Sequence, residues 1–122
     1  MNIVCVGAHP DDCECFVGGT AVLWARAGHR VLFVSMTNGD IGHYAGSGGV
    51  LAQRRMAEAR LSAERGGVQD LILGYHDAEL EATLEARKEV VRIIRRWESY
   101  AKDEAERVAC GVDTKPSLSE AA

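Results

Sequence analysis

Short apolar segments alternate with longer amphipathic segments along the first hundred residues. The apolar segments are rich in β-branched and aliphatic side chains, which is typical of buried parallel strands. They are residues 3–7, 30–36 and 70–74. In the other segments apolar residues recur at helical spacing. These predicted helices are residues 14–27, residues 50–65 and a segment that starts at residue 83.

The alternating order predicts a partial Rossmann-like fold of the α/β class. Strands that alternate with helices form a parallel sheet with right-handed crossovers, so we expect about three core strands in a three-layer α/β/α arrangement. Ligand sites of such sheets lie beyond the carboxyl ends of the strands. The polar residues predicted at these ends are His9, Asp11, Asp12, Thr37, Asp40 and Asp77.

The pattern changes after Trp97. Residues 98–109 continue as a highly charged helix where a further strand would otherwise begin, so no fourth core strand is expected. Residues 113–122 are polar, with a proline and small residues, and offer no apolar periodicity to bury. We therefore expect one domain over residues 1–108, followed by a disordered tail at 109–122.

Charge and apolar content exclude some classes of partner. The net charge of −4, with Arg and Glu alternating along helices, argues against nucleic acid. The apolar runs are much shorter than the roughly 20 residues of a membrane span, and no secretory signal pattern is visible. These features predict a cytoplasmic protein with reduced cysteines, and they leave a homo-oligomer open.

The first strand-to-helix turn carries a distinctive group of side chains. His9 and Asp12 lie three residues apart, so both side chains can point to one spot, and imidazole with carboxylate is an ordinary zinc pair. Pro10 restricts the backbone between them. If a metal holds Asp12, the adjacent Asp11 can accept a proton from a water molecule whose pKa the metal has lowered. A hydrolase needs this division of labour.

The same turn also has a simpler interpretation. Aspartate is favoured at a helix N-cap and in the first helical turn, so Asp11 and Asp12 could serve as caps. Two adjacent carboxylates with His9 and Pro10 directly after an apolar strand favour a site, although both roles can coexist. The thiolates of the neighbouring Cys13 and Cys15 are weaker candidates for adventitious zinc binding.

Four segments together form an ordered set of motifs. They are Val6-Gly7-Ala8-His9-Pro10-Asp11-Asp12-Cys13-Glu14 with Gly18-Gly19-Thr20, then Thr37-Asn38-Gly39-Asp40-Ile41-Gly42, Arg55-Met56-Ala57-Glu58 and Leu73-Gly74-Tyr75-His76-Asp77-Ala78-Glu79-Leu80. This set resembles the signature of the PIG-L/LmbE-like zinc-dependent deacetylases, which hydrolyse N-acetyl groups from glucosamine-containing substrates. The resemblance covers roughly residues 1–97.

The resemblance implies a role for five residues. His9 and Asp12 would bind Zn²⁺, and Asp11 would be the general base. Arg55 and Asp77 would hold the sugar of a small-molecule amino-sugar conjugate. Without the resemblance, Arg55 would be an ordinary exposed helix residue and Asp77 equally well a turn residue.

One part of the family pattern is missing. A catalytic zinc usually has three protein ligands and one open position. In the family the third ligand is a histidine in a His-Pro-Asp-His-like segment, and no such segment follows Trp97. We therefore expect a chain truncated after about residue 97, with catalysis impaired. His43 and His76 are typical of solvent-facing loop histidines.

Two other functional classes fit parts of the pattern. The missing histidines favour a non-catalytic remnant or a metal-binding interaction module. A receiver-like signalling domain also carries paired acids after its first strand, and Asp77 could imitate its phosphoacceptor, but no strand-borne Lys is present. A dinucleotide-binding fold is excluded, because the Gly-x-Gly-x-x-Gly motif is absent and Asp11 and Asp12 would repel a pyrophosphate.

Overall fold

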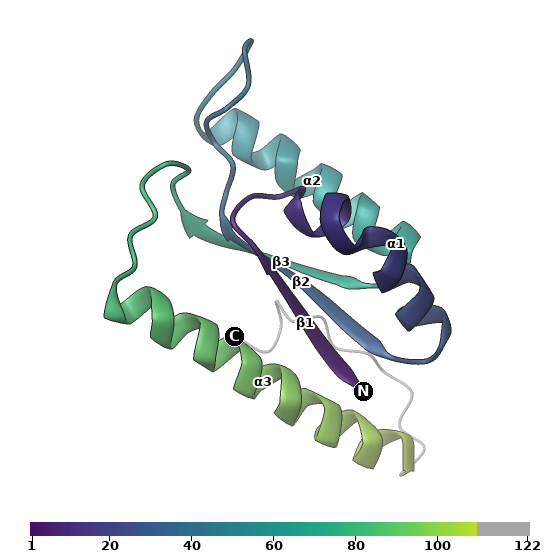
Figure 1. The fold of residues 1–122 in the computed structure, drawn as a ribbon. Coiled ribbons are helices and arrows are strands. Elements are labelled where there is room, and N and C mark those ends of the chain that lie inside the picture. Colours follow the sequence, from purple (N-terminus) through teal and green to yellow (C-terminus); the bar gives the residue numbers. More distant parts are fainter. Residues whose placement is uncertain (110–122) are drawn as a thin grey trace. The chain divides into compact units, whose positions relative to one another are not determined.

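The computed structural model describes the backbone of residues 1–109 and the side chains of residues 1–98. The chain divides into two compact units, the first being Met1–Leu84 and the second beginning at Glu85. In chain order the elements are β1 (Asn2–Gly7), α1 (Asp12–Arg26), β2 (Arg30–Thr37), α2 (Gly49–Gly66), β3 (Gln69–Tyr75) and α3 (Leu84–Ala109) (Figure 1).

The strands of the first unit form one parallel sheet in the order β1-β2-β3. This confirms the α/β class and the three predicted parallel strands. β2 is the central strand, and all of its residues after Arg30 are buried, which agrees with its continuous apolar sequence. The register between β2 and β3 shifts between Ser35 and Thr37, next to the end at which the polar loops begin.

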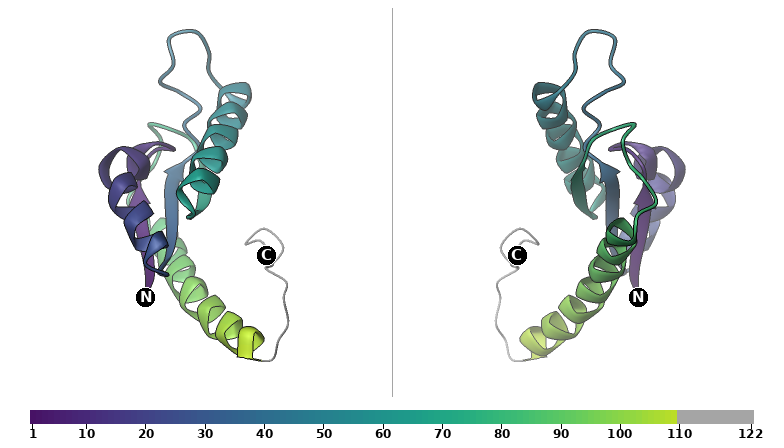
Figure 2. Two further views of the ribbon diagram at one scale, coloured as in Figure 1. Left: turned by 90° about the vertical axis from the view of Figure 1, so that its right-hand side faces the viewer. Right: turned by 90° about the vertical axis from the view of Figure 1, so that its left-hand side faces the viewer.

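Helices α1 and α2 cover one face of this sheet. α1 packs on β1 and β2, α2 packs on β3, and the two helices contact each other (Figures 1 and 2). The core between them and the sheet contains Cys13, Ala21, Val31 and Phe33, with Ile3, Cys5, Val17, Trp24 and Val68 packed against it. The other helical layer of the predicted three-layer arrangement would involve α3, which belongs to the second unit.

α3 is one continuous helix from Leu84 to Ala109. Its length confirms that the charged segment after Trp97 remains helical. The predicted disordered tail lies, apart from Ala109, outside the described residues, and the domain boundary at residue 108 stays a prediction. None of the helices in the described part of the chain combines the length and apolarity that crossing a bilayer would require.

Packing of the sheet against α1 can be tested with two phenylalanines. Phe33 on β2 is 6% exposed, whereas Phe16 on α1 is 84% exposed. We expect Phe33→Ala to lower the free energy of unfolding by about 3–5 kcal/mol, because it removes core contacts and leaves a cavity. The matched control Phe16→Ala should change it by no more than about 0.5 kcal/mol. Similar losses in urea denaturation of the two variants would contradict this core.

Candidate functional site

The turn between β1 and α1 is held by the Asp12 side chain. Asp12 Oδ2 accepts hydrogen bonds from the backbone N–H groups of Ala8 (2.7 Å) and His9 (2.9 Å). A Cβ atom at Gly7 would lie only 2.6 Å from Asp12 Cβ, so glycine is needed for this close approach. The first residue of α1 is therefore fixed against the end of β1.

The end of β2 holds the same turn from its other side. The backbone N–H and the Oγ1 hydroxyl of Thr37 both donate to the carbonyl oxygen of Ala8, each at 2.8 Å. Ser35 Oγ donates to the carbonyl oxygen of His9 at 3.2 Å. Both of these polar β2 side chains are buried. Their hydrogen bonds place the backbone of His9 relative to the sheet.

Asp11 occupies the N-cap position of α1, but its side chain makes no capping hydrogen bond. Its Oδ2 accepts a hydrogen bond from Arg55 Nη2 at 2.7 Å, and the same nitrogen donates to the carbonyl oxygen of Pro10 at 3.2 Å. Gly39 leaves room for the guanidinium, because a Cβ there would lie 2.9 Å from Arg55 Nε. The side chain of Asp11 therefore binds Arg55, and that of Asp12 binds the N–H groups of the preceding turn, so neither is shown capping α1.

The His9 imidazole lies between two carboxylates. Its Nε2 is 2.8 Å from Asp77 Oδ1, and its Nδ1 is 3.6 Å from Asp12 Oδ2. A carboxylate oxygen only accepts, so Nε2 carries the hydrogen that is shared with Asp77. Nδ1 faces Asp12. This is the arrangement of a metal-binding histidine whose second nitrogen is oriented by a carboxylate.

Asp40 links the β2–α2 loop to the β3–α3 loop. Its side chain is buried, with Oδ1 accepting from the Asp77 backbone N–H at 3.0 Å and Oδ2 lying 2.5 Å from His76 Nδ1. The hydrogen bonds from His76 and from the Asp77 amide hold the pKa of Asp40 below its ordinary value. The Asp40 carboxylate raises the pKa of His76.

The donor set of the turn fits a zinc ion. Two ligand atoms about 2.0–2.1 Å from a tetrahedral zinc are about 3.3 Å apart, close to the 3.6 Å between His9 Nδ1 and Asp12 Oδ2. Among the residues that the structure describes, no group of three or more His, Cys, Asp or Glu side chains is arranged to hold a metal. The described site therefore offers two ligands.

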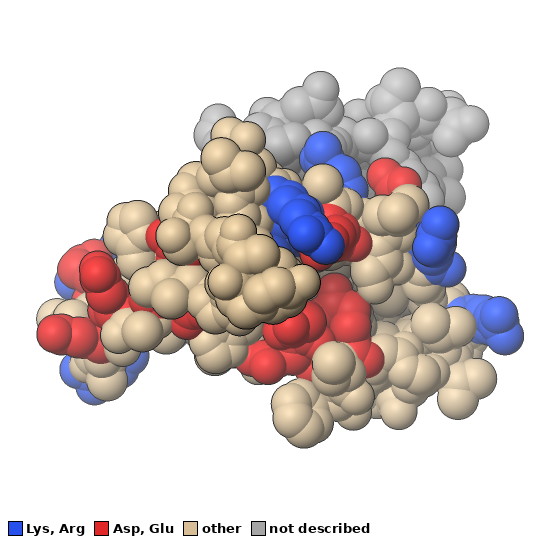
Figure 3. All heavy atoms as spheres, turned by 90° about the horizontal axis from the view of Figure 1, so that it is seen from above, with Lys and Arg blue, Asp and Glu red and all other residues tan. Residues whose placement is uncertain are grey.

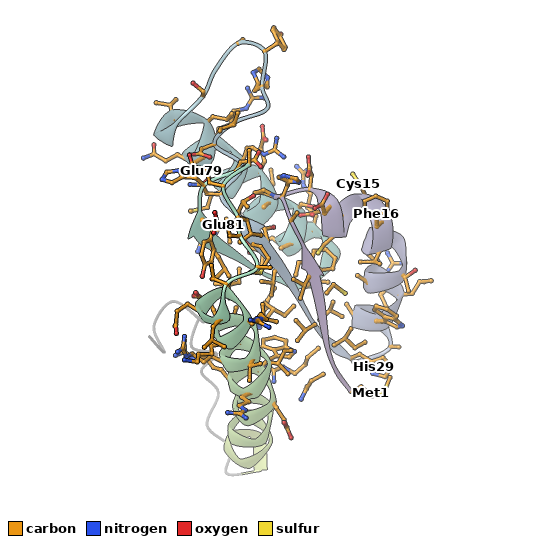
Figure 4. All side chains as sticks on the ribbon, turned by 60° about the vertical axis from the view of Figure 1, so that its left-hand side comes forward. Met1, Cys15, Phe16, His29, Glu79 and Glu81 are labelled. Carbon is orange, nitrogen blue, oxygen red and sulfur yellow. The ribbon has the colours of Figure 1, made fainter. Side chains whose placement is uncertain are left out.

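The cysteines beside the turn differ in accessibility. Cys13 is buried and its Sγ donates to the carbonyl oxygen of Cys5. The pKa of the Cys13 thiol is raised to about 11, mainly by burial. The Cys13 thiolate, which the sequence suggested as an adventitious zinc ligand, is therefore disfavoured. Cys15 is exposed near the start of α1, next to Phe16 (Figure 4).

A cavity of about 330 Å³ lies on the flank of the turn. Its lining is mainly apolar and contains Asp12 as the one charged residue, together with Cys5, Val6, Gly7, Ala8, Cys13, Phe16 and Val17. His9, Asp11 and Arg55 do not line it, so the cavity does not mark the chemistry of the turn. Figure 3, which looks down from above, instead shows acidic side chains gathered next to basic ones.

The structure brings the residues singled out from the sequence into two contacting groups. His9 joins Asp12 and Asp77, and Asp11 pairs with Arg55. His43 takes part in neither and stacks on Tyr44 in the β2–α2 loop. His29 lies away from these groups, beside the N-terminal amino group of Met1 (Figure 4).

Sequence reasoning missed the supporting role of Asp40 and His76. The available signal was the position of Asp40 in a Thr-x-Gly-acid-x-Gly segment, where an acid sits between turn-forming glycines. His76 was predicted to be a solvent-facing loop histidine. Its side chain is indeed 63% exposed, but its Nδ1 is bound to Asp40.

The Asp40–His76 pair predicts a pH-dependent stability. The raised pKa of His76 means that its contribution is complete below about pH 6.5 and is lost as the pH rises through the folded-state pKa. The lowered pKa of Asp40 means that its contribution is complete above about pH 3.9 and is lost as the pH falls through the folded-state pKa. The pair therefore stabilises the fold most between about pH 4 and about pH 6.5.

We expect His76→Gln to lower the melting temperature more at about pH 5.5 than at about pH 8.5. The control His43→Gln changes the other loop histidine, which has no carboxylate partner among the described contacts, and should have a small effect at both pH values. An equal loss for His76→Gln at the two pH values would contradict the pairing.

Comparison with known proteins gives a consistent set of relatives. Residues 4–103 match the PIG-L family, described as GlcNAc-PI de-N-acetylase. A diacetylchitobiose deacetylase of Thermococcus kodakarensis is 40% identical over 98 residues, which are 78% of this chain and 37% of that protein.

Solved structures show the same fold. N,N′-diacetylchitobiose deacetylase from Pyrococcus horikoshii, in complex with its inhibitor MPG, superposes with a TM-score of 0.73 at 37% identity, over 78% of this chain and 37% of that chain. The 4-carboxy-2-hydroxymuconate hydratase GalB of Pseudomonas putida has a TM-score of 0.71 at 22% identity, over 78% of this chain and 42% of that chain, which shows a shared fold alone.

This chain spans about 37% of the length of the two deacetylases that it matches. The family match, in contrast, extends over most of the chain, from residue 4 to residue 103. The strand-to-helix turn with His9, Asp11 and Asp12 lies within the matched region. On this evidence the chain belongs to the PIG-L family.

Proposed function

We propose that this chain forms the metal-binding part of a zinc-dependent hydrolase that removes N-acetyl groups from N-acetylglucosamine-containing substrates. The observation that carries the proposal is the placement of His9, whose Nε2 is held by Asp77 and whose Nδ1 faces Asp12. The adjacent carboxylate of Asp11 lies outside this pair and is available for a second task. Membership of the PIG-L family supports the type of reaction.

His9 and Asp12 are the residues that would hold the zinc ion. When bound, zinc supplies Lewis-acid chemistry, because it lowers the pKa of a water molecule toward neutrality and polarises an amide carbonyl group. Asp12 is already oriented by two backbone N–H groups, and His9 by Asp77. The two ligands therefore lose little further conformational freedom on binding.

Asp11 would act as the general base. Its described contacts engage Oδ2, through Arg55, so Oδ1 can accept a proton from the attacking water molecule. Arg55 Nη2 also holds the carbonyl oxygen of Pro10, and it thereby fixes the backbone on the N-terminal side of Asp11. Arg55 thus orients the Asp11 carboxylate through one contact to the carboxylate and one to the Pro10 carbonyl oxygen.

The substrate class is proposed from the relatives. Two of them are named as deacetylases of diacetylchitobiose, a disaccharide with two N-acetyl groups. We propose that Arg55 and Asp77 contribute to holding the sugar of such a substrate. Both side chains are partly exposed next to the turn, with 21% and 14% of their surface accessible, so a hydroxyl group could share their hydrogen bonds.

A metal-binding module without catalysis is the second candidate function. It is favoured by the described donor set, which contains two ligands where catalytic zinc typically has three. The two candidates differ in hydrolysis but share the zinc site. The receiver-like alternative is no longer needed, because the family match accounts for the paired acids.

Zinc binding is the first test of the proposal. We expect the purified, dialysed chain to bind zinc weakly, and Asp12→Ala to weaken binding by more than the roughly 10- to 100-fold typical of losing an outer-shell partner. Competition with a chromophoric chelator measures both affinities. Asp70→Asn, a partly buried acid at the start of β3, and Cys15→Ser serve as controls and should bind like the parent. Equal zinc affinity of Asp12→Ala and the parent would place the site elsewhere.

Hydrolysis is the second test. We expect the zinc-loaded chain to release acetate from N,N′-diacetylchitobiose far more slowly than the roughly 1–1000 turnovers per second of ordinary enzymes, because its described donors provide two ligands. Asp11→Asn should lower the residual rate by about 100-fold or more. Glu58→Gln, an exposed acid paired with Arg54, is the matched control and should be unaffected.

The outcomes of this assay separate the candidates. A parent rate that Asp11→Asn does not change would remove Asp11 from the reaction. Hydrolysis at ordinary enzyme rates would show that the chain completes the metal shell with a further ligand. Fusion to the C-terminal region of a related deacetylase should raise the rate, and Asp11→Asn should abolish that gain.

A further inference from the structure

The buried carboxylate of Asp40 contacts Asp77, which in turn contacts His9 of the β1–α1 turn. It is 6% exposed and contacts none of His9, Asp11 and Asp12 in the described hydrogen bonds. Its own loop is tied to it at two points, because Asn38 Oδ1 accepts from the Asp40 N–H at 3.1 Å and the Asp40 carbonyl oxygen accepts from the Gly48 N–H at 2.7 Å. The carboxylate is therefore rigidly placed.

The two oxygens of this carboxylate hold the start of the β3–α3 loop. Oδ1 accepts from the Asp77 N–H at 3.0 Å, and Oδ2 binds His76 Nδ1. Two consecutive residues of the loop are thus fixed from one buried anchor. Hydrogen bonds that involve a charged group are roughly twice as strong as neutral ones, so the anchor is well suited to holding an irregular loop.

The loop backbone then directs the Asp77 carboxylate toward His9. The next residue, Ala78, has a φ of 62°, a left-handed conformation that is uncommon for a residue other than glycine. The Ala78 N–H donates to Asp77 Oδ1 at 2.8 Å, and this is the same oxygen that contacts His9 Nε2. The orientation of His9 therefore depends on a loop whose entry Asp40 fixes.

We propose that Asp40 is a positioning residue, which fixes the Asp77 backbone and through it holds the Asp77 carboxylate against His9 Nε2, with His9 Nδ1 turned to Asp12. The proposal rests on the proposed function in so far as it assigns this orientation to zinc binding. None of the hydrogen bonds and ion pairs of the described residues joins Asp40 to His9, Asp11 or Asp12. Its effect is transmitted through one backbone hydrogen bond and one side-chain contact.

The chemistry of the anchor distinguishes three substitutions. Asp40→Ala removes both acceptors and should release the loop. Asp40→Asn keeps one acceptor oxygen for the Asp77 N–H while its amide group can donate to His76, so its effect on His9 should be of the same kind as that of Asp40→Ala but smaller. His76→Ala leaves the Asp40–Asp77 hydrogen bond in place and should affect His9 little.

The test is the tautomer of His9 in the metal-free full chain. Long-range ¹H–¹⁵N spectra of protein labelled at histidine nitrogens distinguish a protonated ring nitrogen from an unprotonated one. We expect His9 to be protonated on Nε2 in the parent, in His76→Ala and in the control Asp70→Asn. In Asp40→Ala we expect a mixture of the two tautomers, with zinc affinity lowered by about 10- to 100-fold.

An unchanged His9 tautomer with unchanged zinc affinity in folded Asp40→Ala would overturn the proposal. If the alanine variant does not fold, Asp40→Asn tests the same link, because a neutral acceptor weakens the hydrogen bond to the Asp77 amide. The Asp77 amide-proton signal and the His9 ring-nitrogen signals are then expected to shift together. A shift at Asp77 without any change at His9 would overturn the proposal.

The two readouts separate this proposal from the one on which it rests. The tautomer is read without metal, so its response to Asp40→Ala reports the positioning role alone. A parent chain that binds no zinc, but whose His9 tautomer responds to Asp40, would disprove the proposed function and leave the positioning role in place.

Discussion

Two hydrogen bonds from the backbone of the β1–α1 turn to the Asp12 carboxylate are the constraint on which the site depends. They join the first residue of α1 to the two residues that follow β1, and they require glycine at position 7 because a side chain there would collide with Asp12. Thr37 on the central strand holds Ala8 from the other side. The turn is consequently part of the sheet's own hydrogen-bond framework, and His9 leaves it in a defined direction.

This constraint organises the polar turn. A carboxylate that accepts two amide N–H groups has its charge compensated and its rotamer fixed by charge-assisted hydrogen bonds. The Asp11–Arg55 pair adds a link from the turn to α2, and Asp40 adds a link between the loops that follow β2 and β3. Contacts from three loops therefore converge at one end of the sheet, where open α/β folds place their ligand sites.

The sequence predicts the parts of this structure that depend on local pattern. The strands and helices follow from apolar periodicity, and their bounds agree with the structure to within two residues. The gathering of His9 and Asp77 at one sheet edge follows from the order of elements. Their partners do not follow, because Arg55 is one of several arginines on α2 and only the packing of that helix selects it. The bridge from Asp40 to His76 depends on the β2–β3 register, which shifts just before the loops begin.

The position of zinc in the protein tests the account most directly. Anomalous diffraction at the zinc absorption edge, from crystals of the metal-loaded chain, locates the ion without reference to activity. We expect a peak about 2.0–2.2 Å from His9 Nδ1 and from the Asp12 carboxylate. A peak at Cys15 or His43, with none at the β1–α1 turn, would contradict it.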